Sequence, residues 1–214
     1  MKLGFLYAGQ GSQKVGMGRD FYDRYPEYRA VLDNAGLDFD LKALSFEGPI
    51  EELSQTRYTQ PCMAAFAVGV TDLLYARGIR PCAAAGLSLG EYSALYAAGV
   101  LDRETVLKTL AFRGRAMEQA AQGLECGMTA VLSLDRDELQ MACDQASELG
   151  VVQICNYNCP GQLVISGEKA AVDRAGELAK ELGAKRCMPL RVSGPFHTRL
   201  MKPAGDALAD YFKT

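Results

Sequence analysis

The chain has 214 residues, of which 49% are hydrophobic and 23% are charged, and its formal net charge is −3. These values are ordinary for a globular protein, and they exclude an overall electrostatic attraction to nucleic acid or to an anionic membrane surface. The seven cysteines show no C-x-x-C pairing, which excludes the disulfide framework of a small secreted domain. We therefore expect a cytoplasmic protein with reduced cysteines, no metal site, no nucleic-acid partner and no membrane segment.

The first part of the chain alternates between short apolar runs and longer amphipathic segments. Strands are predicted at residues 2–8 and 81–87, and helices at residues 20–35, 59–77, 89–98 and 104–122. Pro61 fits the first turn of the second helix, where a missing amide hydrogen costs nothing. Alternation of strands and helices favours an α/β domain with a parallel sheet.

From about Gly127 the spacing of apolar residues changes. Strands are predicted at residues 127–134, 151–158, 163–167 and 184–192, with helices at residues 135–150 and 168–183. The order β-α-β-β-α-β is the ferredoxin-like arrangement. We predict an α/β fold in which residues 1–125 and 193–214 form a large core and residues 126–192 form a small inserted subdomain. One continuous mixed sheet is the alternative.

A G-x-S-x-G pattern, Gly86-Leu87-Ser88-Leu89-Gly90, lies between the second predicted strand and the helix that follows it. In a nucleophile elbow the glycines permit a sharp turn that presents the serine hydroxyl at a helix N-terminus. Amides at that end favour developing negative charge, so the amide of Leu89 is a candidate oxyanion donor. The alternative is that Ser88 only caps the helix.

A serine nucleophile needs a base, and His197 is the single histidine of the chain. It lies in the loop SGPFH and follows Ser88 in chain order, as in α/β-hydrolases. A second glycine-rich segment, AGQGSQKVGMG, follows the first predicted strand and fits neither the dinucleotide-binding nor the Walker pattern. Its backbone is a candidate for a second oxyanion amide, and a plain glycine-rich loop explains the composition equally well.

Five segments in order, from about Leu3 to Tyr211, resemble the malonyl-CoA:acyl carrier protein transacylase family: AGQGSQKVGMG, GLSLGEYSAL, FRGRAM, NYNCPGQLVISG and SGPFHTRLMKPA. The resemblance implies an α/β-hydrolase-like core with an inserted ferredoxin-like subdomain. Family members continue beyond the helix after His197, so we expect the C-terminal part of the core to be absent from this chain. The implied activity is malonyl transfer from coenzyme A to the phosphopantetheine thiol of acyl carrier protein, in fatty acid or polyketide synthesis. Coenzyme A enters as part of the substrate, and no cofactor is expected.

The resemblance also implies roles for the residues at matching positions. Ser88 would carry the malonyl group as an ester, and His197 would move the proton. The backbone amides of Gln10 and Leu89 would form the oxyanion hole.

Two further positions concern the acyl group. Arg113 would hold the malonyl carboxylate, because a planar guanidinium binds a carboxylate through two parallel hydrogen bonds. The alternative for Arg113 is a place on the solvated surface of a helix, where most arginines lie. Met117, one helical turn further along, would line the acyl pocket. Leu87 departs from the family, which usually has histidine there, and we expect Leu87 on the buried side of the elbow.

Two other functions stay open on the sequence. A serine hydrolase or thioesterase would use the same elbow, but it needs a carboxylate to orient His197. The candidates Asp144 and Asp173 fall in predicted helices of the small subdomain. A truncated binding protein without catalytic activity is the other alternative.

Overall fold

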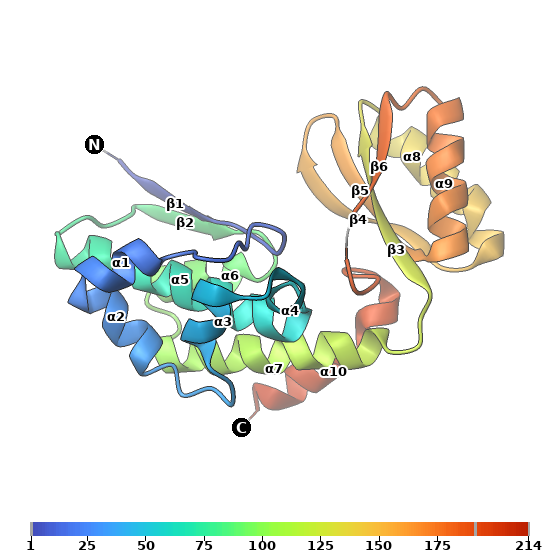
Figure 1. The fold of residues 1–214 in the computed structure, drawn as a ribbon. Coiled ribbons are helices and arrows are strands. Elements are labelled where there is room, and N and C mark those ends of the chain that lie inside the picture. Colours follow the sequence, from blue (N-terminus) through green and yellow to red (C-terminus); the bar gives the residue numbers. More distant parts are fainter. Residues whose placement is uncertain (1, 191, 214) are drawn as a thin grey trace. The chain divides into compact units, whose positions relative to one another are not determined.

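The computed structural model describes residues 2–190 and 192–213, so Arg191, inside the last predicted strand, lies outside the described residues. The contacts divide the chain into two compact units, Met1–Arg115 and Ala116–Thr214. Each unit combines helices with a β-sheet (Figure 1), which confirms the predicted α/β class. None of the described helices is long and apolar enough to span a membrane.

The sheet of the first unit consists of two parallel strands, β1 (Gly4–Tyr7) and β2 (Ala83–Gly86). Gly4 lies opposite Ala83 and Tyr7 lies opposite Gly86, so both strands end at the same level. Helix α6 (Gly90–Ala97) follows β2 directly and packs against both strands. The glycine-rich loop after β1 and the G-x-S-x-G turn after β2 therefore leave the sheet at the same edge.

The predicted helix at residues 20–35 is two helices, α1 (Arg19–Arg24) and α2 (Pro26–Asp33). Proline disfavours helical geometry in the residue before it, and Tyr25 is accordingly extended, with φ −126° and ψ 115°. Two short helices that sequence periodicity missed follow, α3 (Leu41–Glu47) and α4 (Ile50–Leu53). Asp40 caps α3 by accepting a hydrogen bond from the amide of Ala43 at 3.0 Å.

The long helices α5 (Thr56–Ala76) and α7 (Arg103–Ala121) carry much of the apolar core of the first unit. Helix α5 begins three residues earlier than predicted, so Pro61 lies in its second turn and not in its first. The core also takes Tyr28 from α2, whose ring lies so close to Gly69 of α5 that an added Cβ would be 2.5 Å from it. This close packing fixes α2 against α5.

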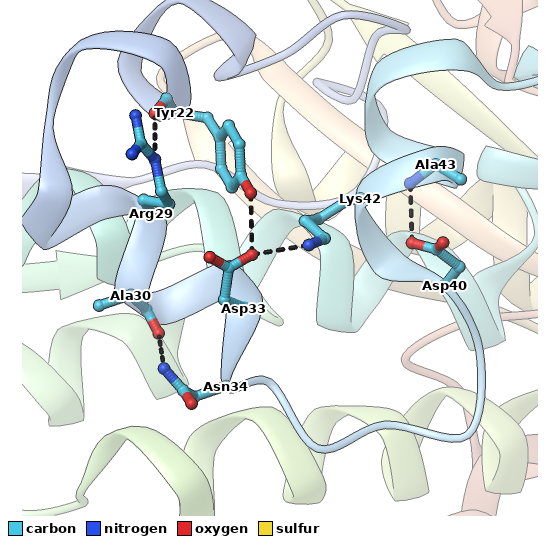
Figure 2. A network of polar contacts seen from close by, with 8 residues as sticks. All are labelled: Tyr22, Arg29, Ala30, Asp33, Asn34, Asp40, Lys42 and Ala43. Atoms are coloured by element: carbon cyan, nitrogen blue, oxygen red, sulfur yellow. Dashed lines mark hydrogen bonds and ion pairs between the residues drawn. The ribbon is translucent and has the colours of Figure 1, made fainter.

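A polar network on the surface of the first unit connects α1, α2 and α3 (Figure 2). The Tyr22 hydroxyl and the Lys42 ammonium group both donate to the same oxygen of Asp33, at 2.9 and 2.6 Å. The hydrogen bond from Lys42 is the main reason why the pKa of Asp33 lies below its ordinary value. Because these side chains are well exposed, the network orients the helices more than it stabilises them.

The second unit contains a four-stranded antiparallel sheet in the order β4-β5-β3-β6. Its elements follow the predicted order of strand, helix, strand, strand, helix, strand: β3 (Cys126–Leu132), α8 (Arg136–Ala146), β4 (Val152–Cys159), β5 (Gln162–Glu168), α9 (Lys169–Glu181) and β6 (Arg186–Pro189). The 3-10 helix η1 (Ser147–Leu149) extends α8. Apolar residues of α8 and α9 pack against one face of this sheet.

The other face of the same sheet contacts a different set of residues. Side chains alternate along β3, so Val131 faces α8 and α9 while Met128 and Ala130 face the opposite side. There they pack with the end of α7 and with residues from the segment that contains η2 (Arg199–Met201) and α10 (Lys202–Tyr211). The contacts therefore divide the chain inside α7. The predicted domains, residues 1–125 with 193–214 and residues 126–192, stay a prediction.

Candidate active site

Ser88 lies in a sharp turn between β2 and α6, as the G-x-S-x-G pattern predicts. Its φ of 53° is in the left-handed region, which costs energy for a residue other than glycine. A Cβ added to Gly86 would lie 2.0 Å from the carbonyl carbon of Gly90, and one added to Gly90 would lie 2.4 Å from the carbonyl oxygen of Tyr7. The turn can therefore form only with glycine at both positions.

Ser88 is not the N-cap residue of α6. The N-cap residue of this helix is Leu89, and no side-chain hydrogen bond caps it. The Ser88 hydroxyl oxygen instead accepts a hydrogen bond from Nη2 of Arg113 at 3.1 Å. This contact makes the simple capping role an inadequate explanation of the serine.

Arg113 lies on α7 and reaches both of the neighbouring helices. Its Nη1 donates to Oε1 of Gln60 on α5 at 2.8 Å, and its guanidinium carbon lies 5.7 Å from the ring centre of Tyr92 on α6. Burial lowers the pKa of Arg113 from its ordinary value, and the neighbouring Tyr92 and the charge of Glu91 oppose that shift. Arg113 is therefore a fixed, partly buried group beside Ser88 and not a solvated arginine of a helix surface.

The close approach of α7 to the start of α5 explains why Arg113 reaches Gln60. A Cβ added to Gly114 would lie 2.7 Å from the carbonyl oxygen of Thr56 and 2.8 Å from Cα of Arg57. Glycine at this position lets the two helix backbones pack almost in contact. The residue before it, Arg113, is thereby held next to the first turns of α5.

The loop after β1 is fixed to the same end of α5. The side-chain amide of Gln10 donates to the Thr56 hydroxyl at 3.1 Å, and the amide of Gly11 donates to Oε1 of Gln13 at 2.8 Å. Within the described residues, the backbone amides of Gln10 and Leu89 donate no hydrogen bond. Both amides are thus available to an oxyanion, although their joint role in an oxyanion hole stays a prediction.

The expectation that Leu87 lies on the buried side of the elbow is wrong. Its side chain is 51% exposed. Successive side chains along a strand point to opposite faces, and Ala83 and Ala85 of β2 are exposed on the face away from α6. Leu87 continues that exposed series, two residues beyond Ala85.

His197 and Met117 belong to the second unit. The exposed His197 has a φ of 60° and lies in a well-fixed turn, because the Thr198 hydroxyl donates to the carbonyl oxygen of Pro195 at 2.7 Å. Phe196 and Met117 are both buried in the cluster beneath this turn. The pairing of His197 with Ser88 and the place of Met117 in an acyl pocket stay predictions.

The two carboxylates that a hydrolase would need already have hydrogen-bond partners within their own helices. Asp144 on α8 accepts from Gln140 at 2.8 Å, and Asp173 on α9 accepts from Lys169 at 2.6 Å. Both are exposed. Neither contact involves His197.

Sequence reasoning missed Gln60 and Tyr92. The available signal for Gln60 was its place in a stripe of core residues at i, i+4 and i+8, since Ala64 and Val68 are both buried in the first core. A glutamine in such a stripe needs a buried partner. Tyr92 gave no comparable signal, because aromatic residues are common on the inner face of a helix.

A cavity of about 640 Å³ lies in the first unit. Its lining includes Phe5 and Tyr7 of β1, Phe66 and Val70 of α5, and Leu89. Ser88 and Arg113 are not among the lining residues, whereas Leu89, the residue after Ser88, is.

The known proteins that are similar to this chain belong to one family. The acyl transferase domain family matches residues 4–214. Malonyl CoA-acyl carrier protein transacylase of Bacillus subtilis is 45% identical over 98% of this chain and 67% of its own length, and that of Escherichia coli K12 is 44% identical over 97% and 68%. The chain thus spans about two thirds of the length of these relatives.

Solved structures agree with these matches. The crystal structure of the Streptococcus pneumoniae enzyme MCAT is 51% identical and has a TM-score of 0.93, covering 100% of this chain and 70% of its own. A malonyl-transacylase in complex with a holo type II polyketide acyl carrier protein, AntF, is 40% identical with a TM-score of 0.95, again covering 100% and 70%. The elbow serine and the arginine of α7 thus belong to an enzyme, and the chain is a member of the malonyl CoA-acyl carrier protein transacylase family.

Proposed function

We propose that this chain moves a malonyl group from coenzyme A to the phosphopantetheine thiol of an acyl carrier protein, through an ester on Ser88. The observation that carries the proposal is the guanidinium of Arg113 at 3.1 Å from the Ser88 hydroxyl. No carboxylate forms an ion pair with Arg113 within the described part of the chain. A partly buried cation beside a nucleophile, without an acidic partner, suits an acyl group that ends in a carboxylate.

In the first half-reaction, Ser88 Oγ attacks the thioester carbonyl of malonyl-CoA. The serine proton passes to the imidazole of His197, and the amides of Gln10 and Leu89 donate to the oxyanion. When the tetrahedral intermediate collapses, the carbon–sulfur bond breaks and coenzyme A leaves as the thiol with that proton. The product is malonyl-Ser88, with its carboxylate paired to Arg113.

In the second half-reaction, the carrier's phosphopantetheine thiol gives its proton to His197 and attacks the ester. The bond between the acyl carbon and Ser88 Oγ breaks, the serine recovers its proton, and malonyl leaves on the carrier. Because water competes with the thiol for the ester, the site has to limit access of water to the acyl carbon. Coenzyme A is a substrate in this scheme, and the scheme uses no cofactor.

The named relatives support the choice of malonyl-CoA and acyl carrier protein as substrates. We further propose an α/β-hydrolase-like core with an inserted ferredoxin-like subdomain. The strand order β4-β5-β3-β6 and the β-α-β-β-α-β sequence of elements support the second part of that description. Absence of the C-terminal part of the core stays a prediction.

The experiment is intact-mass spectrometry of the chain after incubation with malonyl-CoA. We expect a malonyl adduct that maps to Ser88 and disappears when holo acyl carrier protein is added. Ser88→Ala should abolish the adduct, because no other hydroxyl lies in the elbow. Ser93→Ala is the matched control, since this buried serine of α6 lies outside the elbow, and it should keep the adduct.

The alternatives give different results in the same experiment. A hydrolase or thioesterase would release free malonate without a lasting adduct. A binding protein would show neither product. An adduct that persists unchanged in Ser88→Ala would contradict the proposed nucleophile.

A further inference from the structure

We infer that Gln60 is a positioning residue that sets the orientation of Arg113 and thereby the preference for acyl groups that end in a carboxylate. The inference rests on the proposed function and adds a residue to it. The role assigned to Gln60 is to hold Arg113, through the contact of its amide oxygen with Nη1 of that residue. It acts through the guanidinium.

The burial and the chemistry of Gln60 support this role. Only 1% of its surface is exposed, and it lies on α5 among the residues of the first core. A guanidinium has donors and no acceptor, so the atom of Gln60 that faces Nη1 of Arg113 at 2.8 Å has to be the amide oxygen. A buried glutamine in an apolar helix face is costly unless it is hydrogen-bonded, and Arg113 satisfies its oxygen.

The two hydrogen bonds of Arg113 fix the plane of its guanidinium. Nη1 is held by Gln60, and Nη2 is thereby directed to Ser88 at 3.1 Å. Recognition of a carboxylate through two parallel bonds depends on this plane, because both N–H groups have to meet both oxygens. A guanidinium free to rotate would lose that match and would retain only a point charge.

The neutrality of Gln60 is as important as its position. An amide oxygen holds the guanidinium without neutralising its charge, so the full charge stays available to the acyl carboxylate. A glutamate at the same position would form an ion pair with Arg113 and compete with the substrate. The choice of glutamine therefore combines a fixed orientation with an unpaired charge.

The test compares malonyl-CoA with acetyl-CoA as donor in the full chain, for Gln60→Met and Gln60→Glu. Methionine has a similar length and no strong acceptor, so it removes the hydrogen bond while filling the space. We expect the ratio of kcat/KM for malonyl over acetyl to fall about 10- to 100-fold in Gln60→Met, and further in Gln60→Glu. The acetyl rate should change little in both variants.

Thr59→Val is the matched control. Thr59 is the preceding residue of α5, is fully buried, and donates to the carbonyl oxygen of Leu53 at 2.6 Å. This variant should lose stability and keep the malonyl-to-acetyl ratio, because Thr59 makes no contact with Arg113. Ratios within twofold of wild type in both Gln60 variants would overturn the inference while leaving the proposed function intact.

A measurement that needs no activity separates the two claims further. Rotation about the Cζ–Nη bonds of Arg113, followed by ¹⁵N NMR of the guanidinium groups, should be slow in wild type and fast in Gln60→Met. Equally fast rotation in both proteins would overturn the role of Gln60. If the chain instead forms no malonyl ester, the proposed function fails, and the rotation rates still decide whether Gln60 positions Arg113.

Discussion

The direct contacts of Arg113 are with neutral groups, and the carboxylate of Glu91 acts on it only as a weaker, more distant charge. Its hydrogen bonds go to the Gln60 amide oxygen and the Ser88 hydroxyl, and the Tyr92 ring lies beside it. Partial burial of this cation costs desolvation energy. Within the described residues, no ion pair of Arg113 offsets that cost. A carboxylate brought by the substrate would supply the missing partner.

Replacing Arg113 should therefore change selectivity more than chemistry. In Arg113→Ala we expect kcat/KM for malonyl-CoA to fall about 10²–10³-fold, because one partner of the pair is lost at a cost of about 3–5 kcal/mol. Arg113→Lys should recover part of the loss, since lysine keeps the charge without the planar fork. Steady-state kinetics with malonyl-CoA and acetyl-CoA measure both effects, and equal losses for the two donors would show that Arg113 does not bind the carboxylate.

The elbow that carries Ser88 depends on backbone packing between elements. Strand β2 enters it, helix α6 leaves it, and the end of β1 passes so close that Gly90 touches the Tyr7 carbonyl. The strain at Ser88, with its φ of 53°, persists because these neighbours fix the backbone on both sides.

Gly86→Ala should destroy this turn. The added Cβ would lie 2.0 Å from the carbonyl carbon of Gly90, and only a backbone shift can relieve such a clash. We expect no adduct with malonyl-CoA and a lower midpoint of thermal unfolding. The control is Gly205→Ala, on an exposed position of α10 where a Cβ meets nothing within 4 Å. Gly205→Ala should raise the free energy of unfolding by about 0.5–1 kcal/mol. If Gly86→Ala also kept its stability and its adduct, the packing argument would be refuted.

Across the whole molecule, α7 is shared by two cores. Its first half contributes Val106, Leu107 and Leu110 to the core of the first unit, and its end contributes Met117 and Ala121 to a cluster of the second. If one unit unfolds and α7 unfolds with it, the other unit therefore loses the apolar contacts that α7 makes in its core. We expect the two units to unfold together.

Two buried cysteines report on this coupling, one in each unit. Burial raises the pKa of Cys62 and of Cys143 to about 12, so both thiols should resist alkylation at pH 8, when the exposed Cys82 and Cys159 react. With rising urea, labelling of Cys62 and Cys143 should begin over the same concentration range, as measured by peptide mass spectrometry. Labelling of one at clearly lower urea than the other would show that the units unfold independently.

The spacing of apolar residues and the positions of glycine and proline predicted the alternation of strands and helices in both units, because these signals are local. The same holds for the G-x-S-x-G turn, where glycine spacing reflects the absence of room for a Cβ. Local signals also misled at identifiable points. Pro26 ended one predicted helix, the start of α5 was misplaced around Pro61, and α3 and α4 are too short to show a period.

The sequence by itself determined the α/β class, the elbow serine and, through its resemblance to a family, the arginine. Only the tertiary structure decided that Arg113 lies against Ser88 with Gln60 behind it, and that Leu87 is exposed. The physical reason is the range of the interactions. Glycine turns and amphipathic spacing act within a few residues, whereas the Arg113 contacts join α5, α6 and α7 through packing such as that of Gly114 against Thr56, to which distant parts of the chain contribute.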